Sequence, residues 1–114
     1  MAGYRFNTAP ELRVGLGTAR DVGEYCAQLG IKRPLLVTDP GLVTVGLAAP
    51  VQEAMAARCD HVRLFSEVTA DPSESVVLDG LAVLRAGEAD GVVGLGGGSS
   101  MDVAKAIAAL AAGN

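Results

Sequence analysis

Histidine is almost absent from the sequence, and this absence excludes several kinds of reactive site. His61 is the only histidine, so a zinc or iron centre built on two or three imidazoles cannot come from this chain. A Ser/His/Asp or Cys/His arrangement for nucleophilic catalysis cannot be assembled either. His61 lies in a predicted strand, where we expect a surface position rather than a role as a base. The sequence therefore offers no catalytic residue and no metal site of its own.

Cysteine is also scarce, with two residues in the chain. Cys26 and Cys59 lie in unrelated sequence contexts, and neither has a neighbouring histidine that would activate it. A disulfide between them is one interpretation. We favour the interpretation that both are free, partly buried thiols in a reducing compartment.

Aromatic residues make up only 4% of the chain and tryptophan is missing, although half of the residues are hydrophobic. The core must therefore consist of Val, Leu, Ile and Ala, a composition that suits helices layered on parallel strands. With 114 residues, the chain is long enough for one domain with a real core but short for a complete two-substrate enzyme.

Positive charge and long apolar runs are lacking as well. The net charge is −4 and only 19% of the residues are charged. An acidic chain without a basic patch argues against nucleic acid or an anionic membrane as a partner. No apolar run reaches the roughly 18 residues of a membrane span, and the first residues lack the apolar stretch of a signal peptide. We therefore expect a cytoplasmic protein.

What the sequence does contain is a regular alternation of strand and helix patterns. Residues 4–14 have extended character interrupted by Pro10, which predicts an N-terminal extended arm. The elements expected after it are a helix over 18–29 that ends at Gly30, a strand over 34–38, a turn at 39–41 followed by a short, broken helical segment, a helix from Pro50 to Arg58, a strand over 60–65, a helix from Asp71 to Gly87, a strand over 91–95 and a helix over 99–112. This order predicts a single α/β domain over residues 1–114, with a Rossmann-like, doubly wound parallel sheet and helices on both faces.

The most informative motif is the glycine turn Gly96-Gly97-Gly98, which joins the last predicted strand to the last predicted helix. Three glycines remove every Cβ from the turn, so a ligand can approach the backbone closely. The helix behind the turn directs its first N–H groups and its positive dipole end at the same space, which suits a phosphate. We therefore predict a nucleotide cofactor. The alternative is that the turn only lets a strand and a helix pack closely.

Two known phosphate-binding patterns can be compared with this turn. Walker A ends in Gly-Lys-Ser/Thr, which the turn lacks, and this argues against an ATPase. The dinucleotide pattern G-x-G-x-x-G/A is nearly met by residues 94–99, with Ser99 in the last place. The acidic residue that should follow about 20 positions later is missing, because the chain ends first.

Three acidic residues are candidates for a role beside the turn. Asp102 is predicted in the first turn of the last helix, where it would brace the glycine loop or contact the ligand; a solvated ion pair with Lys105 is the alternative. Asp39 directly follows a predicted strand, and its carboxylate would accept hydrogen bonds from ribose hydroxyls and repel a 2′-phosphate. An ordinary Asp-Pro-Gly turn is the other interpretation of Asp39. Asp71 is most simply a helix cap.

The block Gly-Gly-Gly-Ser-x-x-Asp-x-Ala-Lys at residues 96–105 resembles the signature of the iron-containing (group III) alcohol dehydrogenases. Residues 15–17 resemble the family's early Gly-x-Gly turn, residues 36–39 its second-strand end, and residues 68–72 its Val-x-x-Asn-Pro segment. The resemblance implies a two-domain oxidoreductase that moves hydride between NAD and a small alcohol or aldehyde. In that family an N-terminal α/β domain carries the dinucleotide, while a helical C-terminal domain holds iron or zinc through one Asp and three His.

The resemblance also implies roles for individual residues. Gly97, Gly98 and Ser99 would contact the pyrophosphate, while Asp39 would bind the adenosine ribose and favour NAD over NADP. Asp71 stands where the family often has Asn near the cofactor. The predicted cofactor-binding residues are therefore Asp39, Asp71, Gly96, Gly97, Gly98, Ser99 and Asp102.

The family's Thr-rich nicotinamide loop and its four metal ligands would lie beyond Asn114. We therefore expect the cofactor half of such an enzyme, which binds a nucleotide but turns over no substrate alone, and which could pair with a second copy. Two other hypotheses stay open. One is the cofactor domain of a dehydroquinate-synthase-like lyase, although residues 99–105 look more like the alcohol dehydrogenases. The other is a stand-alone nucleotide-binding module without chemistry.

Overall fold

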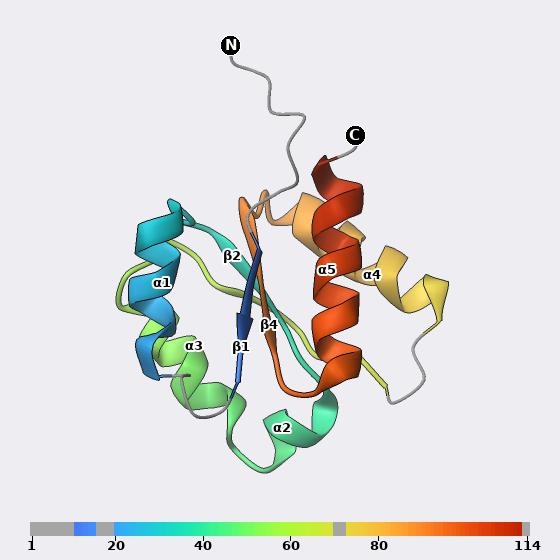
Figure 1. Cartoon of the computed structure of the whole chain (residues 1–114), viewed down its shortest axis with the longest axis horizontal. Helices are drawn as coiled ribbons and strands as arrows, with labels where there is room; N and C mark the ends of the chain where they lie inside the picture. The colour runs from blue at the N-terminus through green and yellow to red at the C-terminus, as the bar shows by residue number, and fades with distance from the viewer. Residues whose placement is uncertain (1–10, 16–19, 70–72, 113–114) are drawn as a thin grey trace.

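The computed structural model of the chain describes residues 11–15, 20–69 and 73–112. Strands and helices alternate along it, as the sequence predicted (Figure 1). In chain order the elements are β1 (Glu11–Val14), α1 (Val22–Leu29), β2 (Pro34–Val37), α2 (Pro40–Thr44), α3 (Ala48–Ala56), β3 (Arg63–Phe65), α4 (Glu74–Ala86), β4 (Gly91–Leu95) and α5 (Gly98–Ala112).

The described strands form a parallel sheet in the order β1-β4-β2-β3. At its centre Leu36 of β2 lies opposite Val93 of β4 on one side and Leu64 of β3 on the other. Every residue of β2 and β4 is buried, because helices cover both faces of the sheet. This confirms the predicted α/β architecture with a Rossmann-like, doubly wound parallel sheet.

Side chains that alternate along β2 and β4 divide the core into two clusters, one on each face of the sheet. One cluster joins Leu35 and Val92 to α4 and α5, and the other joins Leu36 and Val93 to α1 and α3. Figure 1 shows the two pairs of helices on opposite sides of the strands. Within the described part of the chain, no helix is both long enough and apolar enough to cross a membrane.

The segments that follow β2 and β4 run to opposite faces of the sheet. After β2 the chain runs through α2 to α3 and packs on one face, whereas after β4 it enters α5 on the other face. The two strands are hydrogen-bonded neighbours, so their carboxyl ends lie side by side while the following segments diverge. Such a topological switch point opens a crevice where α/β proteins bind ligands.

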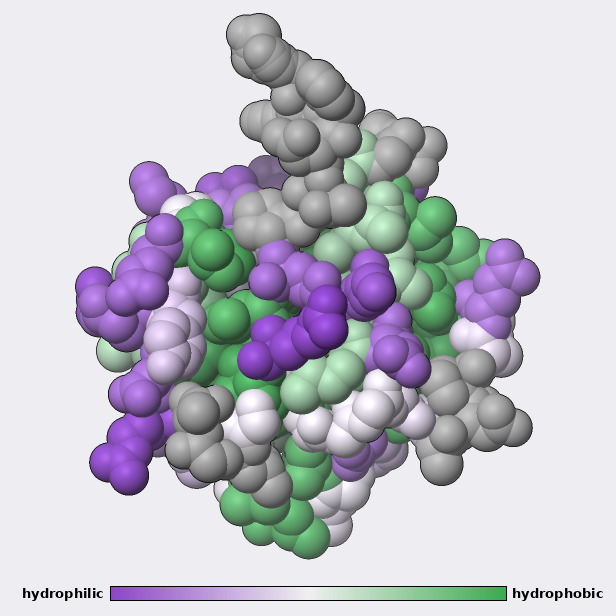
Figure 2. Space-filling model, viewed as in Figure 1, coloured by the Kyte–Doolittle hydropathy of each residue, from purple (hydrophilic) through white to green (hydrophobic). Residues whose placement is uncertain are grey.

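Some large apolar side chains also reach the surface, several of them around α2. Val43, Val45 and Leu47 are exposed there, and Figure 2 shows hydrophobic surface at this end of the molecule. Other parts of this face are polar, mixed or hydrophobic in character. Exposed apolar side chains thus lie beside the segment that follows β2 and also on other helices.

Two predicted boundaries differ from the structure for identifiable reasons. The strand expected over residues 60–65 is reduced to β3, because the N–H groups of Asp60 and His61 donate to the Lys32 carbonyl (2.8 and 3.4 Å) instead of joining the sheet. The turn expected at residues 39–41 is wrong: Asp39 caps α2, which begins at Pro40. The sequence predicted a turn here because Asp, Pro and Gly are favoured in turns as well as at the starts of helices.

The starts of α1 and α4 differ as well, and α3 begins at Ala48 rather than at Pro50. Helix α1 begins at Val22, with Asp21 at its N-cap but no hydrogen bond from the cap side chain; Thr18, where the sequence predicted the helix to begin, lies outside the described residues. Helix α4 begins at Glu74 with Ser73 at the N-cap. The predicted cap Asp71 also lies outside the described residues. Gly30 ends α1 in the left-handed conformation (φ 75°), and Gly87 follows α4, as predicted.

Both cysteines are free thiols, as favoured from the sequence. Cys26 is buried within α1, and the partly buried Cys59 donates a weak hydrogen bond from Sγ to the Ile31 carbonyl (3.6 Å). Burial raises the pKa of the Cys26 thiol from 9.0 to about 12, and it also raises the pKa of Cys59. Cys26 is therefore an unreactive core residue at neutral pH.

The buried thiol predicts a pH dependence of stability. Between about pH 9 and pH 12 the unfolded chain releases the Cys26 proton while the folded protein retains it. Stability therefore falls as the pH rises through this window and is unaffected well below it. By pH 10 the loss should be about 1 kcal/mol relative to pH 8.

Urea unfolding of the wild type and of Cys26→Ala at both pH values measures this loss, because the alanine variant lacks the titrating group. The stability difference between the two proteins should narrow at pH 10. A difference that stays constant between the two pH values would contradict the prediction.

Candidate functional site

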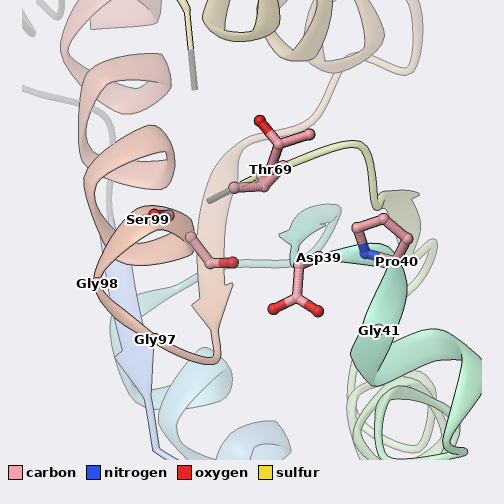
Figure 3. Close-up of a pocket in the computed structure, with 9 residues that line it drawn as sticks. Asp39, Pro40, Gly41, Thr69, Gly97, Gly98 and Ser99 are labelled. Atoms are coloured by element: carbon pink, nitrogen blue, oxygen red, sulfur yellow. The ribbon is translucent and has the colours of Figure 1, made fainter. Parts of the chain in front are cut away.

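A cavity of about 400 Å³ lies at the carboxyl ends of β2 and β4, where the sheet topology opens a crevice. Its size falls in the range of small-molecule sites. Three segments line it: the start of α2, the loop after β3, and the start of α5 (Figure 3). The lining residues are Asp39, Pro40, Gly41, Val68, Thr69, Gly97, Gly98, Ser99 and Ser100.

The three glycines of the turn have different roles in the fold. Gly96 has φ of +122°, and a Cβ there would lie 3.0 Å from Leu42 Cδ1, so the fold itself needs glycine at this position. Neither Gly97 nor Gly98 has a positive φ, and a Cβ at either position would meet nothing within 4 Å. Both line the cavity. The fold does not require glycine at these two positions, and the missing side chains leave the space above the backbone open.

The N-terminus of α5 points at this open space. Helical hydrogen bonding begins where the Met101 N–H donates to the Gly97 carbonyl (3.1 Å). The N–H groups before Met101 therefore precede the helical ladder, and the positive end of the helix dipole lies beside them. Ser99 and the buried Ser100 add hydroxyl groups to the same wall. Together these groups suit an anion such as a phosphate.

Asp39 faces the glycine turn from the end of β2. Its Oδ1 accepts a hydrogen bond from the Leu42 N–H (2.9 Å), which caps α2 and fixes the side chain. Its Oδ2 lies on the other side, 3.5 Å from where a Cβ on Gly96 would be. Figure 3 shows the Asp39 carboxylate reaching into the space between the start of α2 and the glycine turn. One carboxylate oxygen is thus structural, and the second is directed toward the cavity side.

Thr38 holds these two walls together, and sequence reasoning missed it. Its side chain is fully buried (0% exposed), and its Oγ1 donates to the Leu95 carbonyl (3.0 Å). Its N–H donates to the Phe65 carbonyl (2.9 Å). The available signal was a hydroxyl residue that ends an apolar strand directly before an acid, but threonine is also an ordinary strand residue.

The third wall comes from the loop after β3. Val68 is buried beneath the cavity, and Thr69 lies exposed at its edge (Figure 3). The sequence drew attention to this segment only through its resemblance to a family motif that continues to Asp71. Asp71 itself lies outside the described residues, so its contact with a cofactor stays a prediction.

The placement predicted for Asp102 is wrong. Helix α5 begins at Gly98, so its first turn contains no acidic residue and Asp102 lies beyond it. Asp102 is exposed and does not line the cavity. The described residues contain no ion pair between it and the exposed Lys105. No contact among the described residues supports bracing of the glycine loop by Asp102. Contact between Asp102 and a cofactor stays a prediction.

A metal centre does not fit the described part of the chain. Within residues 11–15, 20–69 and 73–112, no group of three or more His, Cys, Asp or Glu side chains could hold a metal ion. His61 is exposed and precedes β3.

The sheet topology and the glycine turn at its switch point define a Rossmann-like α/β domain. The family model described as iron-containing alcohol dehydrogenase matches residues 9–114. The chain therefore belongs to the iron-containing alcohol dehydrogenase family, as its sequence motifs indicated.

Individual relatives agree with this assignment. The chain is 45% identical over 100 residues to 4-hydroxybutyrate dehydrogenase of Cupriavidus necator, covering 88% of this chain and 26% of that protein. It is 36% identical over 107 residues to the NAD-dependent methanol dehydrogenase of Bacillus methanolicus, covering 94% and 28%. Its structure resembles that of NADH-dependent butanol dehydrogenase A from Thermotoga maritima with a TM-score of 0.76 and 28% identity, covering 97% of this chain and 28% of the other. The chain spans about a quarter of the length of these relatives.

Alanine substitution should separate the two kinds of glycine in the turn. Gly96→Ala is expected to lower the free energy of unfolding by roughly 1–3 kcal/mol, because its φ of +122° strains any residue with a Cβ. Gly97→Ala should change it by less than about 1 kcal/mol, because the added methyl group meets nothing. Urea unfolding of both variants measures the difference. Equal destabilisation would show that the fold, rather than a ligand, requires Gly97.

Proposed function

We propose that this chain is the NAD-binding domain of a metal-dependent alcohol dehydrogenase. The observation that carries the proposal is the pair Gly97 and Gly98, which line the cavity although neither the backbone conformation nor the packing requires glycine there. Glycines that the fold does not need, beside a helix N-terminus, are expected where a ligand's phosphates lie against the backbone. The assignment to a dehydrogenase rests on the family to which the chain belongs.

The cavity suits the two polar parts of an adenosine diphosphate group. The diphosphate would lie over Gly97 and Gly98 and accept hydrogen bonds from N–H groups at the start of α5. Ser99 lines the same wall and would add a hydroxyl contact. The Asp39 carboxylate would accept hydrogen bonds from the adenosine ribose while its Oδ1 continues to cap α2. Asp71 would lie near the cofactor, as the family resemblance implies.

Asp39 also supports a preference for NAD over NADP. A carboxylate that accepts hydrogen bonds from the ribose hydroxyls would stand close to the 2′-phosphate of NADP, and two negative groups at that distance repel each other. Two similar proteins named above, the methanol and butanol dehydrogenases, carry NAD or NADH in their names. We therefore assign NAD(H) as the cofactor of this site.

The reaction proposed for the whole enzyme is hydride transfer between NAD and a small alcohol or aldehyde. The nicotinamide ring of the bound cofactor supplies the hydride chemistry. The described residues contribute binding and orientation, because Asp39 is the one ionisable side chain among the described residues that line the cavity and its Oδ1 caps α2. No group of three or more His, Cys, Asp or Glu among the described residues could hold a metal ion. Iron or zinc, and the residues that contact the substrate, would belong to the part of the relatives' length that this chain does not span.

Cofactor fluorescence during titration with NADH and NADPH tests this proposal, with Asp39→Asn as the informative variant. The wild type should bind NADH in preference to NADPH. Asparagine keeps the side-chain oxygen that accepts from Leu42 but loses the charge, so its preference for NADH over NADPH should fall by about tenfold.

Gly97→Val serves as the matched non-binding control, because its branched side chain would occupy the open space above the loop. It should lose affinity for both dinucleotides while its circular dichroism stays unchanged. The proposal fails if the folded wild type binds neither dinucleotide, or if Gly97→Val binds NADH as tightly as the wild type does.

A further inference from the structure

The hydroxyl of Thr38 bridges the two strands whose ends form the cavity. Thr38 follows β2 and is completely buried, and its Oγ1 donates to the carbonyl of Leu95, the last residue of β4. Every buried side-chain polar atom in the described part of the chain has a hydrogen-bond partner. The buried Thr38 hydroxyl therefore has a hydrogen-bond partner, and through it binds the backbone just before the glycine turn.

This bond lies where the backbone pairing of β2 and β4 stops. The last registered pair between these strands is Val37 with Gly94. Thr38 and Leu95 would form the next pair, but here the side chain of Thr38 replaces the backbone ladder. On its other side, Thr38 continues toward β3 by donating its N–H to Phe65. A single residue thus joins the ends of three strands at the switch point.

The groups tied together in this way are those assigned to the cofactor. Asp39 directly follows Thr38, and Gly96 directly follows Leu95. The 3.0 Å bond therefore sets the spacing between the proposed ribose-binding carboxylate and the proposed diphosphate-binding turn. The two segments diverge toward opposite faces of the sheet beyond this point, so no backbone pairing maintains their spacing there.

We propose that Thr38 is a positioning residue of the nucleotide site, whose hydroxyl holds Asp39 and the glycine turn at the separation at which one ligand engages both. This inference rests on the proposed NAD-binding function. Thr38 acts through its neighbours and does not touch the ligand, since it is fully buried and does not line the cavity. A ligand that spans both walls depends on their spacing, whereas a ligand that contacts only the turn does not.

The test compares Thr38→Val with Thr38→Ser, using NADH and inorganic pyrophosphate as the two ligands. Valine has nearly the shape of threonine but leaves the Leu95 carbonyl without its donor, whereas serine keeps the hydroxyl. Thr38→Val should weaken NADH binding by about tenfold, and Thr38→Ser by less than about threefold. Pyrophosphate, which reaches only the glycine turn, should bind Thr38→Val within about twofold of the wild type.

A double-mutant cycle with Asp39→Asn gives a second readout. If Thr38 aligns the carboxylate, Asp39→Asn should cost less NADH affinity in the Thr38→Val background than in the wild type. Should Thr38→Val fail to fold, Thr38→Ala takes its place with the same expectations.

Three outcomes would overturn the inference. One is NADH affinity that Thr38→Val leaves unchanged, and another is an equal loss for NADH and pyrophosphate, which would mean a purely structural role. The third is additive effects in the double-mutant cycle. A folded wild type that does not bind NADH would instead refute the proposed function, and the role of Thr38 with it.

Discussion

The parallel pairing of β2 with β4 is the contact on which both the fold and the candidate site depend. Both strands are buried along their whole length, and their alternating side chains form the centres of two core clusters on opposite faces. The chain leaves β2 toward one face and β4 toward the other. Because adjacent strand ends diverge in this way, the same pairing that builds the core also creates the cavity at the carboxyl edge.

Backbone groups, and polar side chains that hydrogen-bond to the backbone, form most of the cavity wall. This composition fits a binding role. The Asp39 carboxylate caps α2, the start of α5 presents its first N–H groups, and two glycines keep the space between them open. Cys26, whose pKa burial raises to about 12, lies in the core away from the cavity lining. The proposal accordingly assigns cofactor binding to these residues and the reaction to the part of the relatives' length that this chain does not span.

Apolar runs and glycine signals were enough to predict the sheet, the helix layers and the position of the glycine turn. The individual roles within that turn were not predictable, because they depend on the positive φ of Gly96, on its close approach to Leu42, which is distant in sequence, and on the open space at Gly97. Thr38 was missed for a related reason: its hydroxyl has meaning only once Leu95 lies opposite it. Asp102 was misplaced because a small shift in where α5 starts moves a side chain out of the first turn.

A backbone amide NMR titration of the folded chain with NADH tests the central claim most directly, because it locates the ligand residue by residue. The account predicts saturable shifts at the amides of Gly97, Gly98, Ser99 and Asp39, with little change at Lys32 and Arg33, which lie at the amino end of the sheet. Shifts confined to the amino end, or no shifts at saturating NADH, would contradict it.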